Sequence, residues 1–309
     1  MGIVKKCTLY FLRKVAAGSE QGYTGPPHLC ALRALAVKTP IHYFTHGVTL
    51  AYRTYGHGPV PLLAFHGFGR SGTDFAILKD AIGEHFTVHA FDLHFHGKSP
   101  GYPERADRPF TPKELAVYFT AFADHLGSGK VALLGYSLGG RIALSLLETM
   151  PHRVERVFLA APDGLITHPW YRGLAASSVG RTLYRRFVER PGIVHAIMNG
   201  LRSVRLMNER MHRFLIGQTD SKPKRMLVRD VWLCFRLIEP DLTQVAAQVR
   251  ENAVPVHLFF GTHDRVIKPA FGEHLRKHAP ELITQTDLPF GHVLLTPELG
   301  AAISSHLTS

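Results

Sequence analysis

A serine between two glycines stands where a predicted strand, residues 131–134, turns into a predicted helix, residues 140–150. The sequence at this junction is Gly135-Tyr136-Ser137-Leu138-Gly139. Flanking glycines let the strand and the helix pass closely around a strained turn, which would expose the Ser137 hydroxyl. The start of the helix would offer the N–H of Leu138 to a developing oxyanion. The pattern therefore predicts a nucleophilic serine.

A serine hydroxyl is a weak nucleophile at neutral pH, so it needs a base that takes its proton and a carboxylate that orients the base. Asp264 follows the predicted strand 256–260, and His292 follows the predicted strand 282–286. Functional groups of an open α/β sheet gather in the loops after its strands. We therefore predict that His292 is the base for Ser137 and that Asp264 orients it.

A second aspartate competes for the role of the acid. Asp163 follows the predicted strand 157–160, and Asp264 is preferred because of the loop pattern around it. We expect Asp163 to cap the start of the helical segment that follows it.

A second oxyanion donor is expected after the predicted strand 62–65, in the sequence His66-Gly67-Phe68-Gly69. The N–H of Phe68 is the candidate. The stretch Asp92–Ser99 follows the predicted strand 87–91 and contains two more histidines, His94 and His96. We expect these histidines to pack loops and bind backbone groups, and we predict neither a metal site nor a cofactor.

The elements that must position these residues form a repeating pattern. Two β-runs at 41–44 and 48–55 resemble an antiparallel hairpin, and short apolar runs then alternate with helical stretches from Pro61 onward. Continuous apolar strands separated by helices are typical of a parallel sheet covered on both faces. The predicted fold is α/β, with a mostly parallel central sheet flanked by helices.

The alternation stops between the predicted strands 157–160 and 256–260. The intervening residues read as helical, because Val179, Leu183 and Phe187 follow i, i+4 spacing. We predict a core of residues 41–162 and 246–309, an inserted helical lid of residues 163–245, and a basic N-terminal extension of residues 1–40.

These motifs, in this order, resemble the α/β-hydrolase fold family over roughly residues 41–309. The shared elements are HGFG, a D-x-x-x-H-G-x-S loop, GYSLGG, G-x-x-D-R-V and a final G-H. The resemblance implies Ser137 as nucleophile, Asp264 as orienting acid, His292 as base and a helical lid. One departure is Phe95, where relatives usually have glycine. Haloalkane dehalogenases and epoxide hydrolases attack with an aspartate, whereas this position is serine.

The resemblance leaves three functions open. The first is a serine hydrolase of carboxylic esters, with Tyr136, Trp170 and Tyr171 contacting the substrate. The second is a carbon–carbon hydrolase or a pyruvate-eliminating lyase, because GYSLGGR resembles the menaquinone-pathway cyclohexadiene-carboxylate synthase; Arg141 would then hold a substrate carboxylate. The third is a binding scaffold without activity, which a complete set of catalytic groups disfavours. We expect the ester hydrolase.

Composition limits the partners. The chain has 309 residues, 36 Lys and Arg against 24 Asp and Glu, and a net charge of +12. Residues 163–240 hold 14 basic and 6 acidic residues, and residues 1–40 hold 6 and 1, so the remainder has 16 and 17 and is nearly neutral. No nucleic-acid motif accompanies this charge, so we expect a small ester or acyl substrate, and contact with an anionic membrane through the lid or the N-terminus is a further hypothesis.

The chain has only three cysteines, and they lack metal-ligand spacing, which favours a reducing, cytoplasmic location. No stretch reaches the roughly 18 apolar residues needed to span a bilayer. The sequence leaves the acyl length, the oligomeric state and the role of the arginine-rich segment open.

Overall fold

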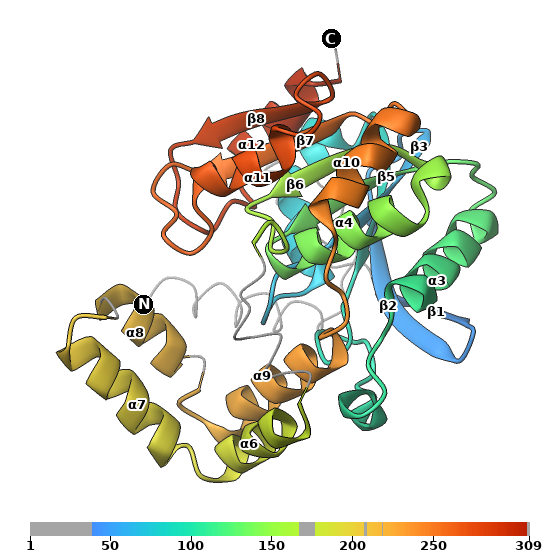
Figure 1. The fold of residues 1–309 in the computed structure, drawn as a ribbon. Coiled ribbons are helices and arrows are strands. Elements are labelled where there is room, and N and C mark those ends of the chain that lie inside the picture. The colour runs from blue at the N-terminus through green and yellow to red at the C-terminus, as the bar shows by residue number, and fades with distance from the viewer. Residues whose placement is uncertain (1–38, 167–176, 207–208, 218, 308–309) are drawn as a thin grey trace, which may run out of the picture. The chain divides into compact units, whose positions relative to one another are not determined.

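The structure is a computed structural model that describes residues 39–166, 177–206, 209–217 and 219–307. Eight strands form one sheet (Figure 1). Their bounds are β1 (Ile41–Thr45), β2 (Val48–Tyr55), β3 (Val60–Phe65), β4 (Phe86–Phe91), β5 (Val131–Tyr136), β6 (Val154–Ala160), β7 (Val256–Gly261) and β8 (Ile283–Leu288). Every strand expected from the sequence is present.

The strand order in the sheet is β1-β2-β4-β3-β5-β6-β7-β8. β1 pairs with β2 and β2 with β4 in antiparallel fashion, and all later pairs are parallel. All six residues of β5 and of β7 are buried, which explains why these strands read as unbroken apolar runs. The predicted α/β fold with a mostly parallel sheet is therefore confirmed.

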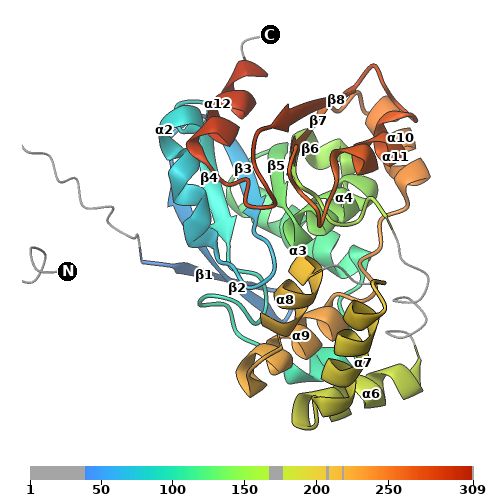
Figure 2. The same ribbon diagram turned by 90° about the vertical axis from the view of Figure 1, so that its left-hand side faces the viewer.

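Helices cover both faces of this sheet. Figure 2 shows α2 and α12 on one face and α3, α4, α10 and α11 on the other. These elements are α2 (Lys79–Ile82), α3 (Pro112–His125), α4 (Leu138–Thr149), α10 (Leu242–Glu251), α11 (Glu273–Arg276) and α12 (Pro297–Ser305). Short 3₁₀ helices occur at Gly72–Leu78, Pro103–Ala106, Pro151–Arg153 and Pro269–Gly272. The core lies between the helices and the buried strands.

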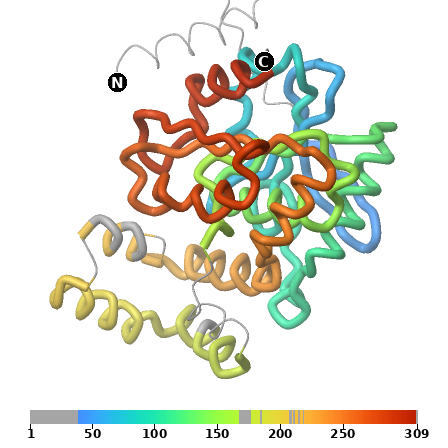
Figure 3. Tube along the Cα trace, turned by 45° about the horizontal axis from the view of Figure 1, so that its top comes forward, coloured from blue at the N-terminus to red at the C-terminus, as the bar shows by residue number. Residues whose placement is uncertain are grey.

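Among the described residues, five helices lie between β6 and β7, and we call the first four the helical insertion. They are α6 (Ser178–Glu189), α7 (Gly192–Ser203), α8 (Glu209–Gly217) and α9 (Lys222–Cys234). Figure 3 shows them as a group beside the core. α10 begins at Leu242, inside the range predicted for the lid, but it packs on α4 of the core. The division into core and lid remains a prediction.

The predicted N-terminal extension, residues 1–40, lies outside the described residues except for its last two positions. Within the described ranges, none of the helices combines the length and the apolar character that crossing a bilayer requires.

Candidate active site

Ser137 occupies a sharp turn between β5 and α4. Its φ of 51° and ψ of −116° lie outside the regions that most residues prefer. A Cβ on Gly135 would lie 2.6 Å from the carbonyl oxygen of Gly139, and a Cβ on Gly139 would collide with the carbonyl oxygen of Phe65. Glycine at both flanks therefore lets α4 start directly against β3 and β5, and the strained residue between them is the serine.

Ser137, His292 and Asp264 form a chain of hydrogen bonds. Ser137 Oγ lies 3.0 Å from His292 Nε2, and His292 Nδ1 lies 2.8 Å from Asp264 Oδ2. With the proton on Nδ1, the imidazole donates to the carboxylate, and its Nε2 lone pair accepts from the Ser137 hydroxyl. The structure thus brings together three side chains from the ends of three strands, in the arrangement that lets a base withdraw the serine proton.

Asp264 is held by the backbone of its own loop. Its side chain is fully buried, and Oδ1 accepts the N–H groups of Val266 at 2.7 Å and Ile267 at 3.0 Å. Because Oδ1 is occupied, Oδ2 is directed to His292. The His292 side chain is one quarter exposed, so the ring reaches the surface while its partner does not.

Tyr136 supports the loop that carries His292. Its hydroxyl donates to the carbonyl oxygen of His292 at 2.9 Å, and the two rings lie 5.8 Å apart between centroids. Burial raises the pKa of the Tyr136 hydroxyl to about 12, so it remains a donor at neutral pH. The sequence predicted a substrate contact for Tyr136, and the structure places its hydroxyl on this backbone carbonyl.

Tyr136→Phe removes this donor and leaves a buried carbonyl with one partner fewer. We expect a stability loss of about 1 kcal/mol and a several-fold lower kcat. The matched control is Tyr43→Phe, which removes a similar bond, 3.0 Å to the carbonyl of Ala121, away from His292. Thermal unfolding and ester turnover of both variants separate the effects. Equal loss of kcat in the control would contradict this role for Tyr136.

The loop His66–Gly69 passes beside Ser137. A Cβ on Gly67 would lie 3.1 Å from the Cβ of Ser137, and Phe68, the predicted oxyanion donor, follows directly. Leu138, the other predicted donor, is the first residue of α4, where a backbone N–H has no acceptor within the helix. Leu138 is thus the neighbour of the serine in the chain, and Phe68 follows the glycine that packs against it.

Two buried histidines fasten this loop to the segment after β4. His66 donates from Nδ1 to the carbonyl of Gly67 at 2.7 Å and accepts the N–H of Leu93 at Nε2, at 3.0 Å. His96 accepts the N–H of Gly69 at 2.9 Å and donates to the carbonyl of His94, also at 2.9 Å. Burial lowers the pKa of both imidazoles, that of His66 to about 3, so they stay neutral and can accept. The expected backbone-binding role is confirmed for both.

A buried ion pair lies beside the segments after β3 and β4. Asp92 is fully buried and binds Arg53 at 3.0 Å. The carboxylate also accepts the N–H groups of Gly72 at 2.7 Å and Lys98 at 2.8 Å. Burying a carboxylate away from water is costly unless several partners bind it, as Arg53 and the two N–H groups do here. Asp92 therefore ties the segment after β3 to the segment after β4.

Arg141 is already paired within the protein. Its guanidinium contacts the two carboxylate oxygens of Asp163 at 3.0 and 2.8 Å, and its side chain is 9% exposed. The expectation that Asp163 caps a helix is wrong, since residues 163–166 form a turn and bends. Asp163 instead neutralises the arginine that was predicted to hold a substrate carboxylate.

An aromatic contact that the sequence did not predict joins the helical insertion to the loop His66–Gly69. Trp232 of α9 stacks on Phe68, with ring centroids 6.3 Å apart and planes 16° apart. It also lies 5.6 Å from the guanidinium carbon of Arg141. The hydrophobic pattern of α9 includes Trp232, but a pattern within one helix does not identify the residue that the tryptophan contacts. Trp170 and Tyr171, the other predicted substrate contacts, lie outside the described residues.

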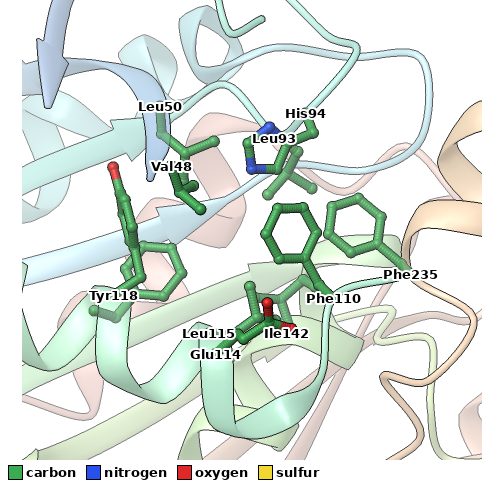
Figure 4. A pocket seen from close by; sticks show the side chains of 11 residues that line it. Val48, Leu50, Leu93, His94, Phe110, Glu114, Leu115, Tyr118, Ile142 and Phe235 are labelled. Carbon is green, nitrogen blue, oxygen red and sulfur yellow. The ribbon is translucent and has the colours of Figure 1, made fainter. Parts of the chain in front are cut away.

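A small cavity lies behind the site, between β2, α3 and α4 (Figure 4). His94, Phe110, Ile142 and Phe235 are among its lining residues, and its volume is about 10 Å³. That volume is close to the minimum for one water molecule, so this is a packing defect and not a substrate pocket.

Comparisons with known proteins give the family that the chain matches and proteins that it resembles. A family described as alpha/beta hydrolase fold matches residues 60–298. The uncharacterized hydrolase YugF of Bacillus subtilis is 25% identical over 275 residues, which cover 87% of this chain and 97% of that protein. A thermophilic esterase from Thermogutta terrifontis has a TM-score of 0.60 at 20% identity, covering 87% of this chain and 98% of its own. The enol-lactonase from Burkholderia xenovorans has a TM-score of 0.56 at 22% identity, with coverage of 87% and 98%.

Proposed function

Because the chain belongs to the alpha/beta hydrolase family, we propose that it is a serine hydrolase that cleaves carboxylic esters through an acyl-enzyme on Ser137. The observation that carries this proposal is the hydrogen-bonded chain from Ser137 through His292 to buried Asp264, at 3.0 and 2.8 Å. A nucleophile, a base and an orienting carboxylate in this geometry are what acyl transfer requires. The esterase and the enol-lactonase among the structural neighbours are named for chemistry of this class.

In the first half of the reaction, His292 Nε2 takes the proton of Ser137 as Oγ attacks the ester carbonyl carbon. The N–H groups of Phe68 and Leu138 bind the resulting oxyanion. Asp264 stabilises the imidazolium without taking its proton. The bond between the carbonyl carbon and the alkoxy oxygen then breaks, and the imidazolium gives its proton to the leaving alcohol.

In the second half, a water molecule attacks the acyl-enzyme. His292 accepts a proton from the water, the oxyanion forms again in the same place, and the Ser137–acyl bond breaks. The proton passes from the imidazolium to Ser137, so a carboxylic acid leaves and the enzyme is restored. The helical insertion would act as the lid, with Trp232 of α9 stacked on Phe68.

The geometry does not favour the lyase alternative. That reaction would use Arg141 to bind a substrate carboxylate, but Asp163 already occupies its guanidinium. Releasing the arginine would leave the partly buried carboxylate of Asp163 without its charged partner, which is costly.

A fluorophosphonate probe tests the proposal, because it forms a covalent bond only with an activated serine. We expect wild-type protein to be labelled, Ser137→Ala to be unlabelled, and the control Ser203→Ala, at an exposed serine of α7, to be labelled at the wild-type rate. A panel of p-nitrophenyl esters of increasing acyl length would then define the substrate. Labelling that persists in Ser137→Ala would refute the assignment.

A further inference from the structure

Exposed aliphatic side chains are concentrated on α6 and α7. Fourteen large apolar side chains are exposed in the described part of the chain, and six of them fall within residues 179–206. They are between 51% and 79% exposed. The set consists of Val179 and Leu183 on α6, Ile193 and Ile197 on α7, and Val204 and Leu206 directly after α7.

These side chains form ordered faces and not scattered positions. The pair on α6 and the pair on α7 are each spaced by four residues, which places the two members of a pair on the same side of the helix. The same helices also contribute buried side chains, such as Phe187 and Met198. On α6, Phe187 continues the row of Val179 and Leu183, so one apolar row is exposed at its start and buried at its end. On α7, Met198 is buried while Ile193 and Ile197 face solvent.

Arginines surround these exposed faces. Residues 177–206 contain six arginines and one glutamate, a net charge of +5. Arg185 is paired with Asp107, and Arg202 lies 3.6 Å from Glu209. Arg186, Arg190 and Arg205 are exposed and form no ion pair with any residue that the structure describes. The surface is thus both apolar and cationic.

The exposed aliphatic side chains and the positive charge together indicate the chemistry of the partner. A nucleic acid would satisfy the arginines but gives no environment for six aliphatic side chains. A second copy of the same surface would bury the aliphatic groups but would bring two charges of the same sign together. An anionic bilayer satisfies both, since aliphatic groups enter the boundary between headgroups and acyl chains while guanidinium groups bind phosphates.

We propose that the surface formed by α6, α7 and residues 204–206 docks the protein onto membranes rich in anionic phospholipid. The proposal does not depend on the reaction catalysed. Figure 1 shows α6 and α7 on the side of the insertion that lies away from the sheet, so docking leaves the core uncovered. α9, which packs on α6, connects this surface to Phe68.

The test measures binding of the full chain to vesicles by co-sedimentation. We expect binding to vesicles of phosphatidylcholine with about 30% phosphatidylserine, little binding to phosphatidylcholine alone, and weaker binding as salt rises. Each arginine near an anionic surface contributes about fivefold in affinity. The triple variant Arg186→Gln, Arg190→Gln, Arg205→Gln should therefore bind about 100-fold more weakly.

Matched controls separate this surface from general charge. The triple variant Lys113→Gln, Lys130→Gln, Lys277→Gln removes the same charge from exposed positions elsewhere and should bind like wild type. The pair Ile193→Ser, Ile197→Ser should lose at least tenfold in affinity, whereas Ile77→Ser, Val117→Ser, also exposed, should not. Thermal unfolding of each variant verifies that it folds.

Three outcomes would overturn the proposal. The first is no binding to the anionic vesicles. The second is binding that the controls weaken as much as the α6 and α7 variants do, because this would place the contact elsewhere on the chain. The third is a dimer in solution that Ile193→Ser, Ile197→Ser converts to a monomer, because a second copy would then be the occupant of the surface.

Discussion

Asp264→Asn is expected to reduce kcat for an ester substrate about 10⁴-fold while the protein remains folded. The amide can keep the bonds that Oδ1 makes to the N–H groups of Val266 and Ile267. It replaces the acceptor facing His292 with an NH₂ donor, so the ring turns its lone pair to Nδ1 and its proton to Nε2. An Nε2 that carries a proton cannot take the proton of Ser137. Steady-state turnover and thermal unfolding measure the two properties separately.

Asp163→Asn is the control for this experiment, because Asp163 also follows a strand and is the rival candidate for the same role. It binds Arg141 at 2.8 Å. We expect it to lower stability, since a buried arginine loses its charged partner, and to change kcat by less than about tenfold. A larger loss of kcat for Asp163→Asn than for Asp264→Asn would move the orienting acid to the end of β6.

The second large effect is loss of stability in acid, to which His66 and His94 contribute because both are buried without charge. Burial lowers the pKa of both His66 and His94 to about 3, against about 6.5 in the unfolded chain. Below pH 6.5 the unfolded chain therefore binds protons that the folded protein does not. Their contribution to stability is complete above about pH 6.5 and is lost as the pH falls toward 3.

The size follows from about 1.4 kcal/mol for each pH unit and each group, so the two histidines together give about 2.7 kcal/mol for each pH unit. Two units remove about 5 kcal/mol, which is comparable to the total stability of a typical domain. Denaturant unfolding between about pH 6 and 4, where the unfolded histidines are protonated and the folded ones are not, measures the slope. His94→Gln should lower the slope by about 1.4 kcal/mol for each pH unit, whereas His152→Gln, at an exposed position, should not change it. Equal slopes for all three proteins would contradict this explanation.

The sequence predicted the sheet well because its strands are recognised from one property, the unbroken run of apolar residues. β5 and β7 are buried at every residue, so their sequences are unbroken apolar runs that fit the interior of a parallel sheet. Ser137, Asp264 and His292 each follow such a run, and the loops after parallel strands meet at one edge. Local patterns thus sufficed to identify three residues that the structure brings within hydrogen-bond distance.

Contacts between distant segments could not be predicted in this way. Arg141 and Asp163 meet because the turn after β6 crosses the start of α4, where Pro162 packs against Gly140. The partner of Trp232 depends on how α9 lies over the core, which the amphipathic pattern of a helix does not determine. The charged and apolar residues of 177–206 could be recognised from the sequence pattern, but the exposure of their side chains could not be predicted.

Phe95 shows that a departure from a family pattern can have a local backbone explanation. The resemblance pointed to glycine at this position, and the structure gives Phe95 a φ of 66°, in the left-handed region that glycine adopts most easily. A Cβ on Gly101 would lie only 2.7 Å from Phe95 Cδ1, so the phenylalanine ring occupies the space that a side chain on Gly101 would need. Phe95 thus adopts a backbone conformation that favours glycine, and its ring packs against Gly101.

The hydrogen bond between Ser137 and His292 joins residues 155 positions apart. Between them the chain must complete β6, cross the helical insertion, return as β7 and add β8 at the edge of the sheet. The elbow at Ser137 is local, but its base follows β8, which comes after the other strands of this sheet in the chain. Reactivity of this serine is therefore a property of the completed topology, and a nascent chain released before β8 would contain the nucleophile without the group that activates it.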